Sequence, residues 1–164
     1  MSAAQLIATL GGVGNLKPAP GTWGSAAALP LMLVLHLIGG FALVLVATVL
    51  LVPLGWWATL EVTKGQADHD PSEVVVDEVV GQWVALFPVS YGATFAGVSV
   101  LALWPGWLVA FLFFRLFDIW KPGPVGWADR KEGPLGVMLD DVIAGALAAA
   151  VVLILGALYH VVLM

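Results

Sequence analysis

The sequence predicts an all-α fold: one domain, residues 1–164, forming a polytopic integral membrane bundle of about five helices. Hydrophobic residues make up 61% of the chain and charged residues only 10%, with a mean hydropathy of +1.01. Soluble domains carry about 25% charged residues, so this chain has too few to cover a water-facing surface. No segment alternates as a barrel strand does, and helices therefore have to make the crossings.

Charged residues fall in three places and leave three charge-free gaps. Lys17 stands alone, a second group runs from Glu61 to Glu78, and a third runs from Arg115 to Asp141. The gaps are residues 18–60, 79–114 and 142–164. A bilayer core takes about 20 helical residues per crossing. The gaps therefore accommodate two crossings, two crossings and one.

The first gap predicts helices at about Ala26–Ile38 and Phe41–Leu60, which turn at Gly39–Gly40. The first of them is short for a full span and fits a half-helix or a re-entrant segment.

The second gap predicts helices at about Val74–Pro88 and Ser99–Asp118, joined by a loose turn around Pro88–Gly97. The last gap predicts one helix at about Val137–Val162. Two crossings return a chain to the side it left, so all three charged groups share one face of the membrane. That face carries all six Lys and Arg residues, and the positive-inside rule makes it cytoplasmic.

Five carboxylates run from the charged groups into apolar helices, where ionisable groups are costly and usually functional. These acids are Asp77, Glu78, Asp118, Asp140 and Asp141. Oxygen ligands of this kind suit Mg²⁺. The absence of cysteine excludes disulfides, thiolate metal sites and a Cys nucleophile.

Two of the acidic pairs have the same surroundings. "VVVDEVV" (74–80) and "VMLDDVI" (137–143) each place a pair after three apolar residues, and Gly81 or Gly145 follows. We predict two equivalent acidic helix starts that face each other, with the glycines allowing close helix approach. The alternative is that these carboxylates only complement helix dipoles.

Arg115, Asp118 and Lys121 are three residues apart and so share one stripe of a helix. One interpretation is an intrahelical ion pair. The other places Asp118 on a metal and the two cations on a phosphate group.

The stretch "GGVGNLKPAPGTWGS" (11–25) is a glycine-rich loop that leads into a helix. Such a loop can present backbone N–H groups to an anion, although a flexible interfacial turn fits equally well. His69 is expected to be a solvated loop residue, with assistance to proton transfer as the alternative.

Four sequence blocks, taken in order, resemble the phosphatidylglycerophosphatase A family. They are "GVGNLKPAPGTWGS" (12–25), "HDPSEVVVDEVVGQW" (69–83), "FRLFDIWKPGP" (114–124) and "GVMLDDVIAG" (136–145). The resemblance implies a small enzyme of the bacterial inner membrane. It would use Mg²⁺ to remove the terminal phosphate of phosphatidylglycerophosphate, within the lipid bilayer. One departure is "KEGPLG" (131–136), where the family usually has a Gly-Gly pair.

The resemblance also assigns roles to residues. The five acids match the family's acidic positions and are expected to bind the metal and carry the catalysis. Residues expected to bind the substrate phosphate are Arg115, Lys121, Asn15, Lys17, Thr22 and Ser25. His69 and Asp70 are possible accessory residues.

Several alternatives stay open. Metal-assisted attack by water is the favoured route, and a covalent aspartyl-phosphate is the competing one. Rival functions are a carboxylate-lined ion carrier or channel subunit, a lipid head-group transferase and a non-catalytic scaffold. The acids gather on one face, which argues against a carrier, and the DG-x2-AR pattern of the transferases is absent. No nucleic-acid partner is expected, and the sequence leaves the oligomeric state and the number of metal ions open.

Overall fold

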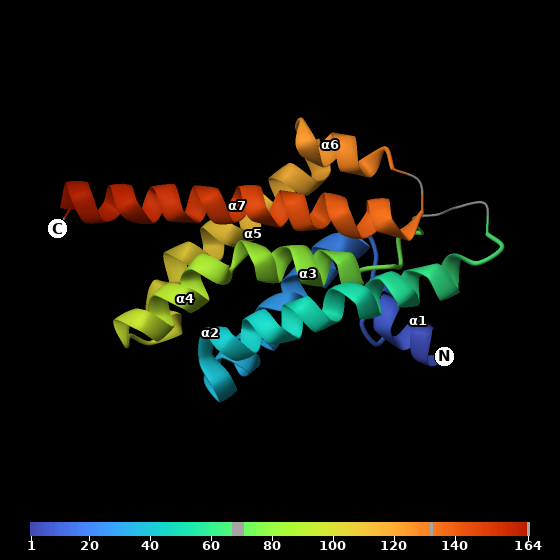
Figure 1. Ribbon diagram of the computed structural model, residues 1–164, viewed down its shortest axis with the longest axis horizontal. Coiled ribbons are helices and arrows are strands. Elements are labelled where there is room, and N and C mark those ends of the chain that lie inside the picture. Colours follow the sequence, from blue (N-terminus) through green and yellow to red (C-terminus); the bar gives the residue numbers. More distant parts are fainter. Residues whose placement is uncertain (67–70, 132, 164) are drawn as a thin grey trace.

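The computed structural model describes residues 1–66, 71–131 and 133–163 (Figure 1). The described residues form helices and no strand, which confirms the all-α prediction. The elements are α1 (Ala3–Ala8), η1 (Val13–Asn15), α2 (Pro20–Thr63), α3 (Val76–Ala85), α4 (Phe87–Ala96), η2 (Val100–Leu103), α5 (Trp104–Trp120), α6 (Pro124–Asp129) and α7 (Pro134–Leu163).

Helix α2 consists of two arms, because Gly39 and Gly40 leave helical geometry and Gly40 has a φ of +59°. The first arm (residues 20–38) and the second arm (residues 41–63) fold back on each other, as Figure 1 shows. The predicted turn at Gly39–Gly40 is thus confirmed. The first arm begins at Pro20 and not at Ala26, because proline suits the first turn of a helix. At 1.5 Å per residue it is roughly 28 Å long, so it is not the short segment that was expected.

The predicted loose turn around Pro88–Gly97 is wrong. Helix α3 ends at Ala85, the chain bends by 44°, and α4 continues from Phe87 to Ala96. Pro88 is tolerated because it lies in the first turn of α4. Gly97, at a φ of +65°, ends this helix in the left-handed conformation that glycine favours.

Among the described residues, three helices are long and apolar enough to cross a membrane, and a fourth span results if α3 and α4 count as one broken span. The three are α2, residues 100–120 and residues 134–161. Since α2 itself contains two arms, the predicted count of about five membrane helices is an approximate description of this bundle.

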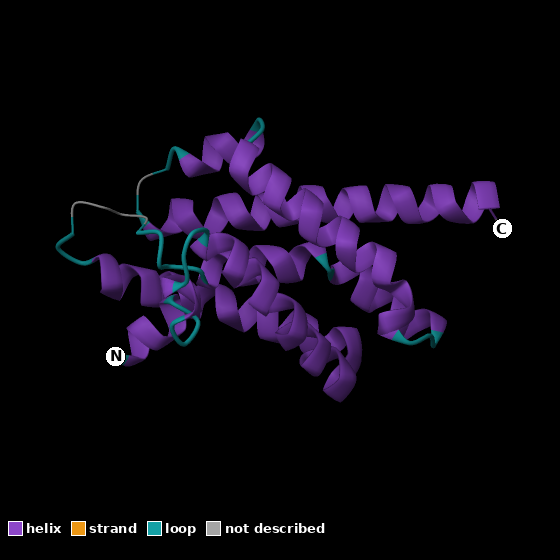
Figure 2. Ribbon diagram, turned by 180° about the vertical axis from the view of Figure 1, so that it is seen from behind, coloured by secondary structure: helices purple, strands orange, loops and turns teal. Residues whose placement is uncertain are grey.

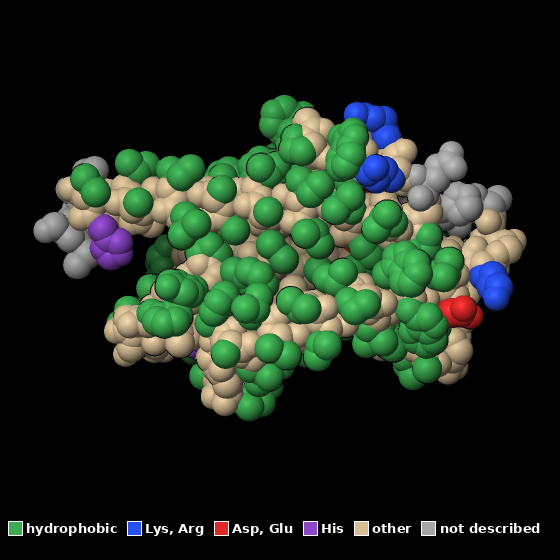
Figure 3. Space-filling model, viewed as in Figure 1, with side chains coloured by type: hydrophobic (Ala, Val, Ile, Leu, Met, Phe, Trp, Pro, Cys, Tyr) green, Lys and Arg blue, Asp and Glu red, His purple; other side chains and the backbone are tan. Residues whose placement is uncertain are grey.

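The two ends of the bundle differ in charge. The N-terminus, the last turn of α2 and the start of α7 lie at one end, and the turn between the two arms of α2 and the C-terminal part of α7 lie at the other (Figures 1 and 2). Most of the face in Figure 3 is hydrophobic, and its visible Lys, Arg, Asp and Glu side chains gather toward the first end. We call this the charged end and the other the turn end.

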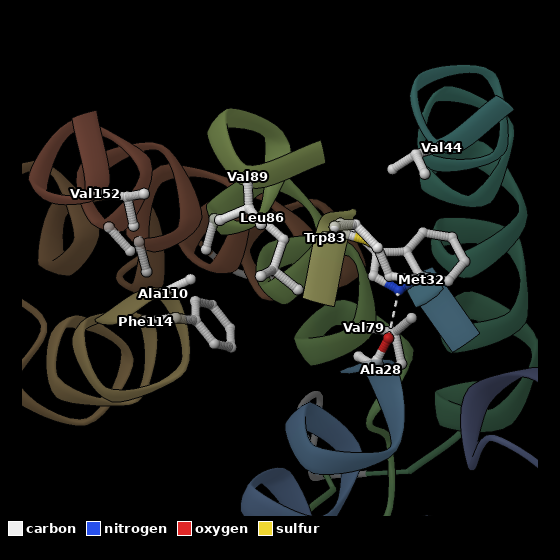
Figure 4. Packing of buried hydrophobic residues seen from close by; sticks show 14 of the residues in the cluster. Ala28, Met32, Val44, Val79, Trp83, Leu86, Val89, Ala110, Phe114 and Val152 are labelled. Carbon is white, nitrogen blue, oxygen red and sulfur yellow. Dashed lines mark hydrogen bonds between the residues drawn. The ribbon is translucent and has the colours of Figure 1, made fainter. Parts of the chain in front are cut away.

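Short helix α3 is the centre of the core. Its side chains pack against both arms of α2, α5 and α7, as Figure 4 shows for part of the cluster. Trp83 ties α3 to the first arm, since its indole Nε1 donates a hydrogen bond of 2.9 Å to the Ala28 carbonyl. Burial on nearly every side fixes the axis of α3, and with it the direction of the acids in its first turn.

Helices α3 and α7 cross backbone to backbone at two glycines. A Cβ atom on Gly81 would lie 2.5 Å from the Phe114 ring and 2.6 Å from the Asp141 carbonyl oxygen. A Cβ atom on Gly145 would overlap the Gly81 carbonyl. The predicted close approach at these glycines is therefore confirmed.

Candidate active site

The five acids singled out in the sequence line one cavity of about 310 Å³ at the charged end. They reach it from three helices: two from α3, one from α5 and two from α7. The remaining lining residues are Arg115, Lys121, Ala19, Pro20, Gly21, Ser72 and Val74.

Asp77 and Glu78 occupy the first turn of α3. Carboxylates there complement the helix dipole, so the dipole interpretation holds for this pair. Gly21, at the start of the first arm, makes room for the Glu78 carboxylate, because a Cβ atom at that position would collide with Glu78 Oε1. The α2 N-terminus and the α3 N-terminus therefore meet at the cavity.

Asp140 and Asp141 lie two turns inside α7 and not at its start, so the prediction of two equivalent helix starts is wrong for this pair. The helix begins earlier than expected because Pro134 suits its first turn. Both side chains are buried, at 5% and 3% exposure. A dipole effect is confined to the first turn and does not account for them.

Arg115 is oriented by two contacts. Its Nη1 lies 2.7 Å from Asp118 Oδ2 and donates a hydrogen bond of 3.4 Å to the Ser25 hydroxyl. Ser25 in turn donates to the Gly21 carbonyl at 2.8 Å. The intrahelical ion pair considered from the sequence is present, and Asp118 lines the cavity as well.

Lys121 leaves the predicted helical stripe. Helix α5 ends at Trp120, and Lys121 adopts a left-handed backbone with a φ of +49°. Its ammonium nevertheless reaches the cavity and contacts Asp129 at 2.5 Å and Asp140 at 2.6 Å. Burial opposes the charge, but the hydrogen bonds to these two carboxylates outweigh it and raise the pKa of Lys121 above its usual value.

The carboxylates form two overlapping groups that could hold a metal ion. One oxygen from each of Asp77, Glu78 and Asp141 lies within 4.8 Å of the other two, and the same holds for Asp118, Asp140 and Asp141. Asp141 belongs to both groups. All donors are hard carboxylate oxygens that are partly or fully buried, a set that fits Mg²⁺ and not a thiophilic metal.

Other predicted residues lie apart from this cavity. Asn15 lines a second cavity of about 220 Å³, beside Thr9 and Gln66. Lys17 is exposed, and Thr22 is half-buried next to Gly21 without lining the acidic cavity. His69 and Asp70 lie outside the described residues.

Two residues near the site were missed from the sequence. Asp129, the last residue of α6, was not singled out, yet its carboxylate and that of Asp140 both contact the Lys121 ammonium. Gln82 follows Glu78 by one helical turn and is fully buried. A lone polar residue in the apolar run "VVGQWVALF" (79–87) was the available signal.

Comparison with known proteins adds independent information. A family model described as Phosphatidylglycerophosphatase A matches residues 6–156. A Phosphatidylglycerophosphatase A of Haemophilus influenzae is 37% identical, covering 93% of this chain and 88% of its own, and one of Escherichia coli is 30% identical, covering 93% and 83%. A putative phosphatidylinositol-3-phosphatase of Bacteroides thetaiotaomicron is 39% identical, covering 85% of each chain. No solved structure matches.

Proposed function

This chain belongs to the phosphatidylglycerophosphatase A family, and from that premise we propose that it hydrolyses phosphatidylglycerophosphate to phosphatidylglycerol and phosphate. The chain as a whole would form one membrane-embedded phosphatase domain in the bacterial inner membrane. Relatives that carry the family's name cover most of the chain and are themselves mostly covered by it.

The observation that carries the proposal is the convergence of five carboxylates and two cationic side chains on one cavity. The carboxylates outnumber the cations, and unbalanced buried negative charge is unfavourable without a positive partner. A divalent cation would offset most of this excess. We infer that Mg²⁺ is this cation and that the two overlapping carboxylate groups hold it.

Phosphate binding would involve the cationic side chains and a helix terminus. Arg115 offers a planar fork to the phosphoryl oxygens, and Lys121 supplies a point charge. The first arm of α2 starts at the cavity without a side-chain cap. The N–H group of Gly21, in the first turn of this helix and at the cavity wall, would be available to a phosphate oxygen.

In the proposed reaction, water attacks phosphorus, and the bond from phosphorus to the glycerol oxygen breaks. Bound Mg²⁺ would draw charge from the phosphoryl group as the transition state forms. We propose Glu78 as the acceptor of the water's proton, because its carboxylate lines the cavity in which the phosphate group would bind. Lys121 would offset the charge on the departing glycerol oxygen.

The site would face the cytoplasm. The Lys and Arg residues fall in segments of the charged end, and the positive-inside rule places such segments on the cytoplasmic side. The acyl chains of the substrate would then stay in the inner leaflet, with the head group at the cavity.

The test is phosphate release from phosphatidylglycerophosphate by the purified protein in lipid nanodiscs. We expect activity that a chelator removes and Mg²⁺ restores, and that Asp118→Asn lowers by orders of magnitude. Glu61→Gln is the matched control, since it neutralises an exposed carboxylate on α2 outside the cavity. A folded Asp118→Asn protein with full activity would contradict the site, and metal-independent hydrolysis would contradict the role of Mg²⁺. An acid-stable phosphoprotein trapped during turnover would favour the aspartyl-phosphate route.

A second substrate needs a direct comparison, because one relative is named as a putative phosphatidylinositol-3-phosphatase. Phosphate release from phosphatidylinositol 3-phosphate in the same nanodiscs should be much slower. A faster rate on that lipid would reassign the substrate while leaving the phosphatase chemistry in place. Ion flux through reconstituted vesicles, without hydrolysis, would instead support the carrier alternative.

A further inference from the structure

Gln82 is a fully buried amide whose two polar atoms, Oε1 and Nε2, both lack a hydrogen-bond partner among the residues that the structure describes. Its neighbour Trp83 shows the contrast, since the buried indole N–H is satisfied by the Ala28 carbonyl. Leaving both ends of an amide unpaired inside an apolar bundle is unfavourable and calls for a reason, such as a bound water.

Gln82 lies on α3 one helical turn after Glu78, which lines the acidic cavity. Gln82 follows Glu78 by four residues on α3, so the two side chains are neighbours on one face, with Cβ atoms about 5–6 Å apart. The residues on either side point elsewhere: Gly81 faces Phe114 and Trp83 faces Ala28. Gln82 is not among the residues that line the cavity, so it does not contact a substrate held there.

Two more buried atoms without partners belong to residues of this region. They are Glu78 Oε2 and Arg115 Nε, while Arg115 Nη1 is engaged by Asp118 and Ser25. Glu78 and Arg115 both approach Gly21, so the two side chains are close to each other. A buried water is stable when it has two to four polar partners. One that donates to Glu78 Oε2 and to Gln82 Oε1 and accepts from Arg115 Nε meets that condition.

We propose that Gln82 is a positioning residue: together with Arg115 it holds a buried water against Glu78, and this water fixes the orientation of the Glu78 carboxylate. The role of that carboxylate in turnover rests on the function proposed above. The water itself is a feature of the folded chain and can be tested without substrate.

The first experiment combines kinetics and thermal unfolding of Gln82→Leu in nanodiscs. We expect kcat to fall by about 10- to 100-fold, as outer-shell substitutions typically do. KM should stay within about twofold, because the amide lies outside the cavity. The melting temperature should be nearly unchanged, since the amide makes no direct hydrogen bond to another described residue and an apolar side chain of similar size fills its place. Gln82→Met, which is unbranched and closer in shape, should behave the same way.

Thr59→Val is the matched control. Thr59, on the second arm of α2, is also fully buried with an unpaired side-chain oxygen, but it does not line the cavity. Removing its hydroxyl should leave both kcat and KM unchanged.

Three results would overturn the proposal. The first is a kcat within twofold of wild type for both Gln82 variants. The second is a lower melting temperature that accompanies the lost activity, and the third is failure of both variants to fold. The last two would make the amide a structural element. If the wild-type chain releases no phosphate, the proposed function fails, and a high-resolution structure of that chain decides the water separately. Ordered density between Glu78 and Gln82 supports it, and a dry contact around the amide overturns it.

Discussion

The two ends of this bundle differ in how their polar groups are paired. At the turn end, the backbone N–H of Phe41 donates to Thr94 Oγ1 at 3.0 Å, and His36 Nδ1 and Ser90 Oγ form a hydrogen bond of 2.8 Å. Phe41 also packs edge-on against Phe87, at a centroid distance of 5.6 Å. At the charged end, side chains such as Glu78 keep buried oxygens without partners, and carboxylates crowd within 4.8 Å of one another.

We infer from this difference that the turn end stabilises the fold and that the charged end carries the proposed chemistry. Satisfied hydrogen bonds and packed rings at the turn end stabilise the fold. Crowded carboxylates at the charged end are unfavourable in the folded chain, and under the proposed function a bound cation would offset their repulsion. Substitutions at the two ends should therefore separate stability from activity.

Asp141→Asn should have the largest effect. Asp141 is the residue common to both candidate metal groups, so we expect phosphate release to fall by about 10²- to 10³-fold or more. The melting temperature without Mg²⁺ should not fall, because a crowded buried charge is removed. Steady-state kinetics and thermal unfolding of the same preparation check both halves. An unfolded variant would mean that the charged end also serves stability.

Arg115→Lys should have the next largest effect. The substitution keeps the positive charge but loses the planar fork that contacts Asp118 and Ser25, and we expect a loss of activity of about 10- to 100-fold. Unchanged kinetics would show that the charge alone matters at this position. Arg130→Lys, an exposed site on the same side of the molecule, is the control and should be neutral.

Gly145→Ala and Gly156→Ala compare the two ends along one helix, α7. A methyl group at Gly145 would overlap the Gly81 carbonyl, so the variant should be less stable by about 1–3 kcal/mol. A Cβ atom at Gly156 would meet no described atom within 4 Å outside its own stretch of helix, and alanine there should stabilise the helix by about 0.5–1 kcal/mol. Denaturation in matched detergent measures both. Equal effects would contradict the backbone contact between α3 and α7.

Ser90→Ala should have the smallest effect. It removes the hydrogen-bond partner of His36 Nδ1 and should lower the free energy of unfolding by about 1 kcal/mol. Phosphate release at a temperature well below the unfolding transition should remain at the wild-type rate. A loss of activity out of proportion to the loss of stability would show that the turn end influences the site.

Much of this arrangement was predictable because placing a charged side chain in the hydrocarbon core of a bilayer has a high free-energy cost. From this energetic cost we predicted that the charged segments share one end and that the chain turns at Gly39–Gly40. The same cost singled out the five acids that line the cavity. This cost gives no information on the structure of segments that carry no charge. Helix α4 was missed for this reason, since residues 88–98 carry no charge and Pro88 suggested a break where it in fact starts a helix.

Details set by local backbone geometry were also beyond the sequence. The left-handed conformation of Lys121 removed it from the expected stripe, although its long side chain still reached the cavity. The early start of α7 at Pro134 moved Asp140 and Asp141 inside the helix. Gln82 was overlooked because an uncharged amide does not stand out among charges, and only its burial without partners made it conspicuous.

The glycine crossing of α3 and α7 has a mechanical consequence. Main chains that touch at Gly81 and Gly145 leave no side-chain layer to deform, so the two helices behave as one stiff frame. Four of the five cavity carboxylates belong to these two helices. Entry of a lipid head group and release of the product would require the cavity to open. We expect the moving elements to be α5 and the first arm of α2, which contribute further residues to the cavity wall.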